Sequence, residues 1–448
     1  MHVALSLLLC CISSLIFMAP PAHAARPYIA VGEAQVKKTV VAIPKIRVLD
    51  PTFNGAGDAI RETMVNDLSF MDSFRVLDQS AYIENASTSG IIQGSFKYPD
   101  WSSIGSDFLV KTKVTLDPGK ALVLEAHLFN ITESKEVLSK IYRSTPGQVR
   151  TMAHQLANDI VQNVTGLPGI FLTKIAMSCD RTGKKEIYMM NYDGTEVKQV
   201  THHRSLAIGP AWSPDATKIA YSLMTRHKNN IKNIDVFEFN LVNNTIKMIS
   251  NRRGINSGPA YSPDGQNLAL TLSFGENSEL YRLNLRSGKI THLTHSFGVD
   301  VDPNWSPDGK YIAFVSTRTG LSMIHRMNAD GSNAQRLTFA GKYNATPSWS
   351  LQNNKIAFAG WLEGLFDIFI MNPDGSNIER LTKNQGNNED PYFSPDGNFV
   401  TFSSNRTGQK NIYVMNIDGS FVRRLTYGLG NCVSPKWSNP PTVATPSR

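Results

Sequence analysis

A five-residue pattern, aromatic-Ser-Pro-Asp-Gly, returns through the second half of this chain at a nearly constant spacing. The copies, some of them imperfect, begin at Trp212, Tyr261, Trp305, Trp349, Phe393 and Trp437. Successive copies are 49, 44, 44, 44 and 44 residues apart. A constant period of this length is typical of stacked or radial repeat proteins, so it constrains the fold more than any other feature.

The letters inside one period predict four strands. Residues 306–309, Ser-Pro-Asp-Gly, fit a type I turn, and the apolar run 311–316 that follows is typical of a buried strand. Further along the period, Asp-Gly pairs such as Asp418-Gly419 predict tight hairpins, and a last strand ends in Arg-Leu-Thr, as at 424–426. Four strands of about five residues with short connections fill about 44 residues and leave no room for a helix. Six such periods predict a six-bladed β-propeller, because radial closure removes exposed sheet edges.

The amino terminus has the features of a signal peptide. Residues 1–24 contain no Lys, Arg, Asp or Glu and end in Ala22-His23-Ala24, a pattern that signal peptidase cleaves. The alternative is an uncleaved membrane anchor, but the apolar core 3–18 is short for a membrane span. We therefore expect a mature chain that begins at Ala25, is exported and has no transmembrane segment.

The repeat also predicts how the ring closes. The strand at 173–178 has no aromatic-Ser-Pro-Asp turn before it, whereas Trp437 has no second strand after it. We therefore expect 432–437 to be the innermost strand of the blade that begins at Ile170. This pairing places Cys179 and Cys432 near each other in a compartment where disulfides persist. Either a disulfide or two separately buried thiols would fit, and the sequence favours the thiols.

Residues 25–165 have a different pattern. Apolar residues recur with helical spacing at Ile60, Met64 and Leu68 and again through 149–164, and extended runs cover 108–116, 122–129 and 137–142. This pattern predicts a small α/β domain with an antiparallel hairpin pair. Residues 166–169, Gly-Leu-Pro-Gly, are the expected hinge into a propeller that spans 170–448.

The sequence contains none of the common catalytic motifs. There is no nucleophile elbow, phosphate-binding loop, His-Glu-x-x-His or paired Cys-x-x-Cys, so we predict that the chain is not an enzyme. The net charge is +8, but the basic residues are scattered, which argues against nucleic-acid binding. The pairs His202-His203 and His292 with His295 could ligate a metal, although solvated loop histidines are the better interpretation.

Residues that enter the innermost strands are expected to line the mouth of the central channel. They combine carboxylates with neutral polar groups: Asn256, Ser257, Asp300, Asp302, Asn344, Thr346, Glu389 and Asp390. Such a ring suits a peptide with amide or basic groups, or weakly a hard cation such as Ca²⁺. An ordinary polar loop rim is the alternative.

The order of these features resembles the TolB family, the periplasmic component of the Tol-Pal system of Gram-negative bacteria. The resemblance covers residues 25–448: a signal peptide, a small α/β domain, the stretch LANDIVQNVTGLPGIFLTKIAMS and the WSPDG blades. It implies a non-enzymatic periplasmic adaptor, a monomer within a complex, that supports outer-membrane integrity and constriction at cell division. The family's propeller mouth binds the lipoprotein Pal, and its mature amino terminus binds TolA.

Carried onto this sequence, the resemblance places the Pal surface on Ile255, Asn256 and Ser257 and on Val301-Asp302-Pro303. It places the TolA segment on Tyr28, Ile29, Ala30, Val31 and Gly32. Two features depart from the family: Ile255 stands where a polar imidazole is common, and the turn at Ser350 is degenerate. A further hypothesis is that the chain exchanges its partners, so that binding at the channel mouth is coupled to docking or release of the amino-terminal segment.

Two other classes of protein remain as alternatives. An exported solute-binding or glycan-binding propeller would share the fold. Propellers of prolyl-oligopeptidase-like peptidases also use the WSPDG turn, but they need a fused hydrolase domain, and residues 25–165 contain no nucleophile elbow.

Overall fold

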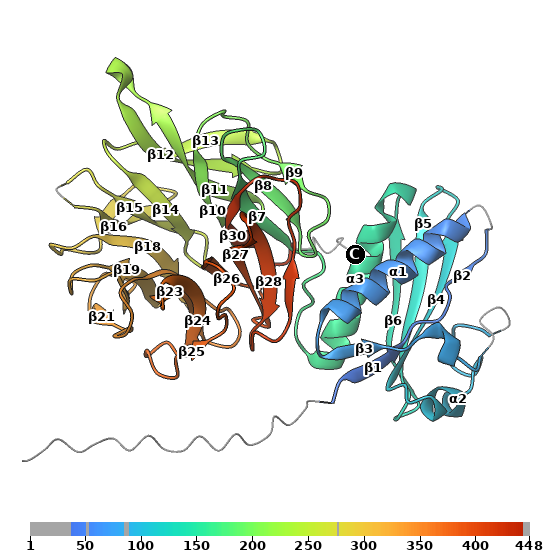
Figure 1. Cartoon of the computed structure of the whole chain (residues 1–448). Coiled ribbons are helices and arrows are strands. Elements are labelled where there is room, and N and C mark those ends of the chain that lie inside the picture. The colour runs from blue at the N-terminus through green and yellow to red at the C-terminus, as the bar shows by residue number, and fades with distance from the viewer. Residues whose placement is uncertain (1–36, 51–52, 85–88, 276, 442–448) are drawn as a thin grey trace, which may run out of the picture. The chain divides into compact units, whose positions relative to one another are not determined.

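A computed structural model describes residues 37–50, 53–84, 89–275 and 277–441. It contains an α/β domain followed by a β-propeller (Figure 1). The expected signal peptide and the expected TolA segment 28–32 lie outside the described residues. None of the described helices is both long and apolar enough to pass through a bilayer.

The α/β domain has a mixed sheet with strand order β3-β1-β4-β5-β6, and β2 pairs with β4. Strand β1 runs parallel to β3 and β4, whereas β4, β5 and β6 are antiparallel, as the predicted hairpin pair requires. The strands are β1 (Thr39–Ala42), β2 (Arg47–Val48), β3 (Phe74–Val76), β4 (Phe108–Leu116), β5 (Leu122–Asn130) and β6 (Lys135–Ser144). The helices are α1 (Asn54–Phe70), α2 (Tyr98–Ser103) and α3 (Val149–Thr165), with short 3₁₀ turns at Gln79–Ala81 and Pro146–Gln148.

The predicted helical periodicity corresponds to the core of this domain. Ile60, Met64 and Leu68 of α1 are fully buried in one cluster with Leu156 of α3 and Leu124 of β5. A second cluster, around Trp101 of α2, packs with Leu109 and Phe129. Helices α1 and α3 therefore pack on one face of the sheet, and α2 packs on the other.

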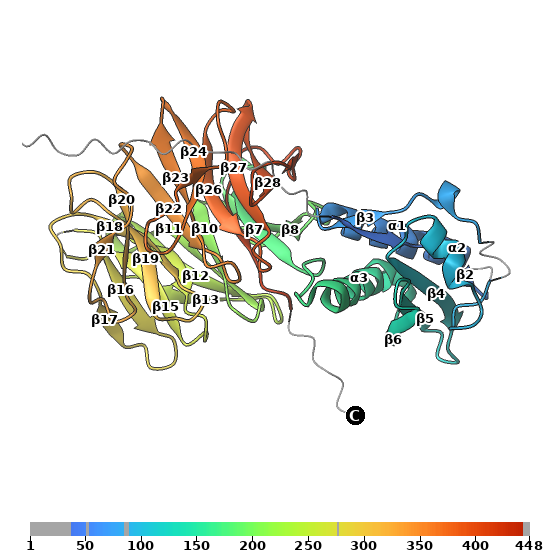
Figure 2. The same cartoon turned by 90° about the horizontal axis from the view of Figure 1, so that it is seen from below.

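The second part has six four-stranded antiparallel sheets, so the predicted fold class is confirmed (Figures 1 and 2). Each sheet is one blade, and five of them are continuous in sequence.

Blade 2 has β10 (Ala207–Trp212), β11 (Lys218–Arg226), β12 (Lys232–Asn240) and β13 (Thr245–Ser250), with a 3₁₀ turn at Lys228–Asn230. Blade 3 has β14 (Asn256–Tyr261), β15 (Asn267–Leu272), β16 (Glu279–Asn284) and β17 (Ile290–His292). Blade 4 has β18 (Asp300–Trp305), β19 (Tyr311–Ser316), β20 (Met323–Asn328) and β21 (Gln335–Arg336). Blade 5 has β22 (Asn344–Trp349), β23 (Ile356–Leu362), β24 (Leu365–Met371) and β25 (Glu379–Arg380). Blade 6 has β26 (Asn388–Phe393), β27 (Phe399–Thr407), β28 (Gln409–Asn416) and β29 (Val422–Arg424).

Blade 1 closes the ring as predicted. It combines β7 (Lys174–Cys179), β8 (Glu186–Asn191) and β9 (Lys198–Gln199) with the last strand, β30 (Cys432–Trp437). Figure 1 shows β30, in red, beside β7, in green, and the two strands are antiparallel. Cys432 is bonded to Cys179 in a disulfide, so the expectation of two separate thiols is wrong. Spacing along the chain could not decide this point, since it depends on the pairing register of the two strands.

The repeated Ser-Pro-Asp-Gly letters have a structural role. In blade 4 the Ser306 hydroxyl donates to the Asp308 carboxylate (2.6 Å) and accepts from the backbone N–H of Tyr311 (2.9 Å). The aromatic residue ahead of the turn joins neighbouring blades, because the indole Nε1 of Trp305 donates to the carbonyl of Ala260 (3.1 Å). These contacts support the interpretation of the motif as a turn rather than a chemical site.

Residues 166–169 connect α3 to the first blade. Gly166 has φ +76° and ends α3 with a backbone bond to the carbonyl of Gln162 (3.0 Å). Gly169 packs closely on α3, since a Cβ there would lie 2.1 Å from Oδ1 of Asn158. The hinge at 166–169 stays a prediction, as do the domain boundaries drawn from it.

Candidate partner-binding site

Every innermost strand of the propeller carries a β-bulge at the same point. One residue of each bulge has φ between 50° and 60° and stands directly before a proline: Gly209, Gly258, Asp302, Thr346, Asp390 and Ser434. The left-handed conformation costs a non-glycine residue roughly 1–2 kcal/mol. Four of the six positions are nevertheless polar residues other than glycine. Bulges commonly redirect side chains beside functional sites, so this ring is the first candidate for partner recognition.

The polar residues of the bulges interact with one another. The Asp390 carboxylate accepts from the backbone N–H of Ser434 (3.0 Å) and from the hydroxyl of Ser403 (3.2 Å). Burial raises the pKa of Asp302; the charge of Asp390 adds to this rise, and the charge of Lys436 opposes it. Since Asp302 and Asp390 come from blades 4 and 6, the two carboxylates influence each other across the ring.

Lys436 supplies a cation that sequence reasoning missed. Burial lowers the pKa of its ammonium, whereas the carboxylates of Asp390 and Asp302 favour the charged form. Its Nζ lies 4.6 Å from the ring centroid of Tyr392, within cation–π range. The position of Lys436 in the last strand hides this role, because only closure of the ring brings β30 beside β26.

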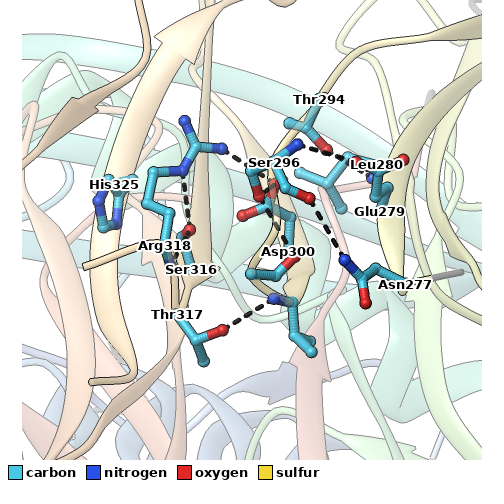
Figure 3. Close-up of polar contacts among 12 residues, drawn as sticks. Asn277, Glu279, Leu280, Thr294, Ser296, Asp300, Ser316, Thr317, Arg318 and His325 are labelled. Carbon is cyan, nitrogen blue, oxygen red and sulfur yellow. Dashed lines mark hydrogen bonds and ion pairs between the residues drawn. The ribbon is translucent and has the colours of Figure 1, made fainter. Parts of the chain in front are cut away.

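The first residue of each inner strand is buried. Asp300 is fully buried, and its carboxylate accepts from the Arg318 guanidinium (2.9 Å) and the Ser296 hydroxyl (3.0 Å) (Figure 3). Asn256 and Asn344 are buried in the same way and donate to the carbonyls of Ile234 (2.9 Å) and Ala340 (3.0 Å). These three predicted mouth residues therefore position the loops, and a partner at the mouth would not reach their side chains.

The other predicted mouth residues are open to solvent to different degrees. Ile255 is 41% exposed, and the rest are half-buried: Ser257, Val301, Asp302, Thr346, Glu389 and Asp390. Glu389 forms an ion pair with Lys410 (2.8 Å), which neutralises part of the acidic character expected from sequence.

Large apolar side chains are exposed in the loops at the same end of the propeller. Several precede the inner strands or join the second and third strands: Phe274, Phe297, Val299, Phe339, Tyr343 and Tyr427. Exposed apolar groups gathered on one face of a protein mark interaction sites. The sequence signal was present, because Phe339 and Tyr427 directly follow the Leu-Thr pair after an outer strand, where a polar loop is expected.

One histidine of each predicted pair is engaged in a protein contact. His203 Nε2 lies 2.8 Å from the Tyr221 hydroxyl, and His292 bonds Glu279 and stacks on the ring of Tyr281. Within the described ranges, no three His, Cys, Asp or Glu side chains are placed to hold a metal ion. The expectation of Ca²⁺ in the channel therefore gains no support from this geometry.

A closed ring of six four-stranded blades defines the class of protein, a six-bladed β-propeller, and sequence comparison identifies its family. Residues 161–360 and 346–443 match the TolB beta propeller domain, and residues 27–137 match the TolB amino-terminal domain. The chain belongs to the TolB family, whose members are non-enzymatic Tol-Pal system proteins. The prediction that the chain is not an enzyme agrees with this family.

Individual relatives agree with this assignment. The chain is 40% identical over 225 residues to the Tol-Pal system protein TolB of Geobacter metallireducens, a match covering 49% of each protein. It is 34% identical over 237 residues to TolB of Anaeromyxobacter dehalogenans, covering 51% of this chain and 52% of that protein. These matches span about half the length of the curated relatives.

A solved structure shows the same fold. The crystal structure of TolB from Acinetobacter baumannii superposes with a TM-score of 0.77 at 24% identity. The superposition covers 90% of this chain and 97% of that one.

Proposed function

We propose that this chain is a non-enzymatic periplasmic adaptor of the Tol-Pal system. In this proposal the propeller mouth binds the outer-membrane lipoprotein Pal, and the mature amino-terminal segment around Tyr28 to Gly32 binds TolA. The adaptor supports outer-membrane integrity and constriction at cell division. Family membership supports the system, and the resemblance described above suggests the two partners.

The observation that carries the Pal half of the proposal is the composition of the mouth. Apolar side chains, among them Phe297 and Phe339, are exposed in loops at the end of the propeller where polar residues such as Asp302 and Asp390 enter the inner strands. An apolar rim supplies buried area, and the polar centre supplies hydrogen bonds for peptide amides or basic groups. A solute-binding propeller would need the channel but not the apolar rim.

The experiment is a calorimetric titration of the mature chain with the soluble domain of Pal. Replacing Phe297 and Phe339 by serine changes exposed side chains and should weaken binding at least about tenfold. Phe421→Ser is the matched control, since Phe421 is also exposed but follows the β28 hairpin at the opposite end of the propeller. Unchanged affinity in the double variant would contradict the mouth as the Pal site.

Two further titrations separate the remaining possibilities. Glu389→Lys reverses a charge at the entrance and should also weaken Pal binding. Peptidoglycan fragments alone should not bind, and saturable binding of them would favour the glycan-binding alternative. Deletion of residues 25–36 should abolish TolA binding while Pal binding persists, and an unchanged TolA affinity would contradict that half of the proposal.

A further inference from the structure

Blade 2 differs from the other five blades at its outer edge. Strand β13 has six residues, whereas the outermost strands β9, β17, β21, β25 and β29 have two or three. The extra residues of the 49-residue period that begins at Trp212 lie in the long β11–β12 hairpin, so the length of β13 is a separate feature of this blade. Proteins commonly keep edge strands short because an open edge presents unpaired N–H and C=O groups. Blade 2 is therefore the one blade, among those described, with an outer strand long enough to accept another strand.

The edge of β13 is unoccupied in the described part of the chain. The sheet order is β10-β11-β12-β13, so β13 is paired on one side only. A strand with one free edge is the structural requirement for β-augmentation, in which an extended peptide adds to a sheet.

One face of β13 is apolar and open to solvent. Ile246 is 47% exposed and Met248 is 46% exposed. Their cross-strand partners are Phe239 and Phe237. Paired residues share a face of the sheet, and these two phenylalanines pack into the cluster between blades 1 and 2. The apolar face of β13 therefore continues outward from that cluster.

A groove lies between blades 1 and 2 beside this face. It has a volume of about 490 Å³ and apolar walls that include Met189, Val200, Phe239 and Leu241. Asn244, which directly precedes β13, lines its end. A strand added to β13 would thus direct alternate side chains towards an apolar groove.

Most charged side chains around the edge are basic, although Lys174 also lies within electrostatic range of Glu196 and Asp193. The groove lining contains Lys174 and Lys198 and no carboxylate. Lys247 lies in the middle of β13, and Arg252 and Arg253 follow the strand; in the described ranges none of these three forms an ion pair. The acid directly opposite Lys247 on β12 is Glu238, which accepts a hydrogen bond from Tyr261 and lies 3.4 Å from Lys218.

Lys247 also decides between two possible occupants. It alternates with Ile246 and Met248, so its side chain lies on the opposite face of β13 from the groove. Two copies of β13 paired antiparallel about Lys247 would bring the two lysines together, which is unfavourable. A strand with acidic residues on that face would instead be attracted.

We propose that β13 accepts an extended segment of another protein as a fifth strand of blade 2. The segment alternates apolar and acidic residues: its apolar side chains enter the groove between blades 1 and 2, and its carboxylates meet Lys247 and the arginines after β13. This interaction surface is separate from the channel mouth and does not depend on Pal or TolA.

The test uses the mature chain and two fluorescent peptides, one of alternating valine and glutamate and one of alternating valine and lysine. Anisotropy should show binding of the glutamate peptide at least about tenfold tighter than the lysine peptide. Lys247→Glu should remove or reverse this preference. Lys289→Glu is the matched control, because Lys289 is exposed beside the short outer strand β17 of blade 3.

Hydrogen exchange locates the bound peptide. The amides of 245–250 should exchange more slowly with the glutamate peptide bound, and those of 290–292 should not change. The proposal is overturned by absent binding, by equal affinity for the two peptides, or by protection confined to another blade. A dimer in sedimentation that dissociates on Met248→Lys would also overturn it, since the occupant would then be a second copy.

Discussion

Cys432, in the last strand, lies directly opposite Cys179, in the first strand of the propeller, with their Cα atoms 4.2 Å apart and bonded through their sulfurs. The two residues are 253 positions apart in sequence. One covalent bond therefore encloses the whole ring. A cross-link across so long a loop greatly restricts the unfolded chain, which is the main way a disulfide stabilises a protein.

Removing this bond should destabilise the propeller. The double variant Cys179→Ala, Cys432→Ala should lose roughly 2–5 kcal/mol of unfolding free energy, measured by denaturant titration. Reductant should destabilise the unmodified protein by a similar amount and leave the variant unaffected. Two titratable thiols in the unreduced, denatured protein would contradict the bond.

The hairpin glycines should show the effect of contact between blades. Gly331 has φ +94° and a Cβ there would lie 2.3 Å from the carbonyl oxygen of Leu293 in the preceding blade. Gly320 has φ +93° but has no atom within 4 Å of such a Cβ. Gly320→Ala should therefore cost only the backbone strain of roughly 1–2 kcal/mol, and Gly331→Ala should cost about 1–3 kcal/mol more. Equal losses in thermal or chemical unfolding would show that the neighbouring blade yields.

Repeat symmetry predicts which substitution of Asp300 is tolerated. In blade 6 the equivalent residue is Asn388, and its side-chain oxygen accepts from Arg406 (2.9 Å) as Asp300 accepts from Arg318. Asp300→Asn should therefore change the free energy of unfolding by less than about 1 kcal/mol. Asp300→Leu should cost roughly 3–5 kcal/mol, because it leaves the guanidinium without its partner. Pal affinity should be retained in Asp300→Asn, since this side chain is not at the surface.

Asp302 should give a pH dependence of stability. Because burial raises its pKa in the folded protein, the folded state holds this proton more tightly than the unfolded state. Stability must then fall as the pH rises from about 4, the usual carboxyl value, through the raised pKa. Asp302→Asn should accordingly stabilise the protein at pH 7 and lose this advantage near pH 4, as measured by denaturant unfolding at the two pH values.

Asp308 provides a control of opposite sign. The hydrogen bond from Ser306 lowers the pKa of Asp308, so its ionised form stabilises the fold. Asp308→Asn should be destabilising at pH 7, and the difference should disappear as the pH falls through the lowered pKa. If both substitutions acted in the same direction, the electrostatic explanation for Asp302 would be wrong.

The tryptophan that ends the chain's last strand should matter more than its position suggests. Trp437 is buried, and its indole donates to the Thr173 hydroxyl (2.7 Å). Trp437→Ala should cost roughly 3–5 kcal/mol in unfolding free energy. A loss below about 1 kcal/mol would indicate that closure does not depend on this residue.

The sequence by itself determined the blades, their number and their closure. Turn and hairpin letters such as Ser306 to Gly309 act on neighbouring residues, so they can be recognised without the fold. The strand at 173–178 lacks a preceding turn, and the turn at Trp437 lacks a following strand. The repeat pattern alone therefore predicts that these two segments complete one blade.

Tertiary structure alone decided which of the predicted mouth side chains are accessible. Asp300 and Asp302 are two positions apart, and the sequence predicts the same role for both. In the structure, Asp300 is buried against Arg318, whereas Asp302 lies in the bulge of the inner strand. The Cys179–Cys432 bond, the charge of Lys436 inside the ring and the open edge of β13 likewise depend on residues brought together by closure or left unpaired by it. Burial and electrostatic contact are properties of neighbours in space, and a repeat period specifies only neighbours along the chain.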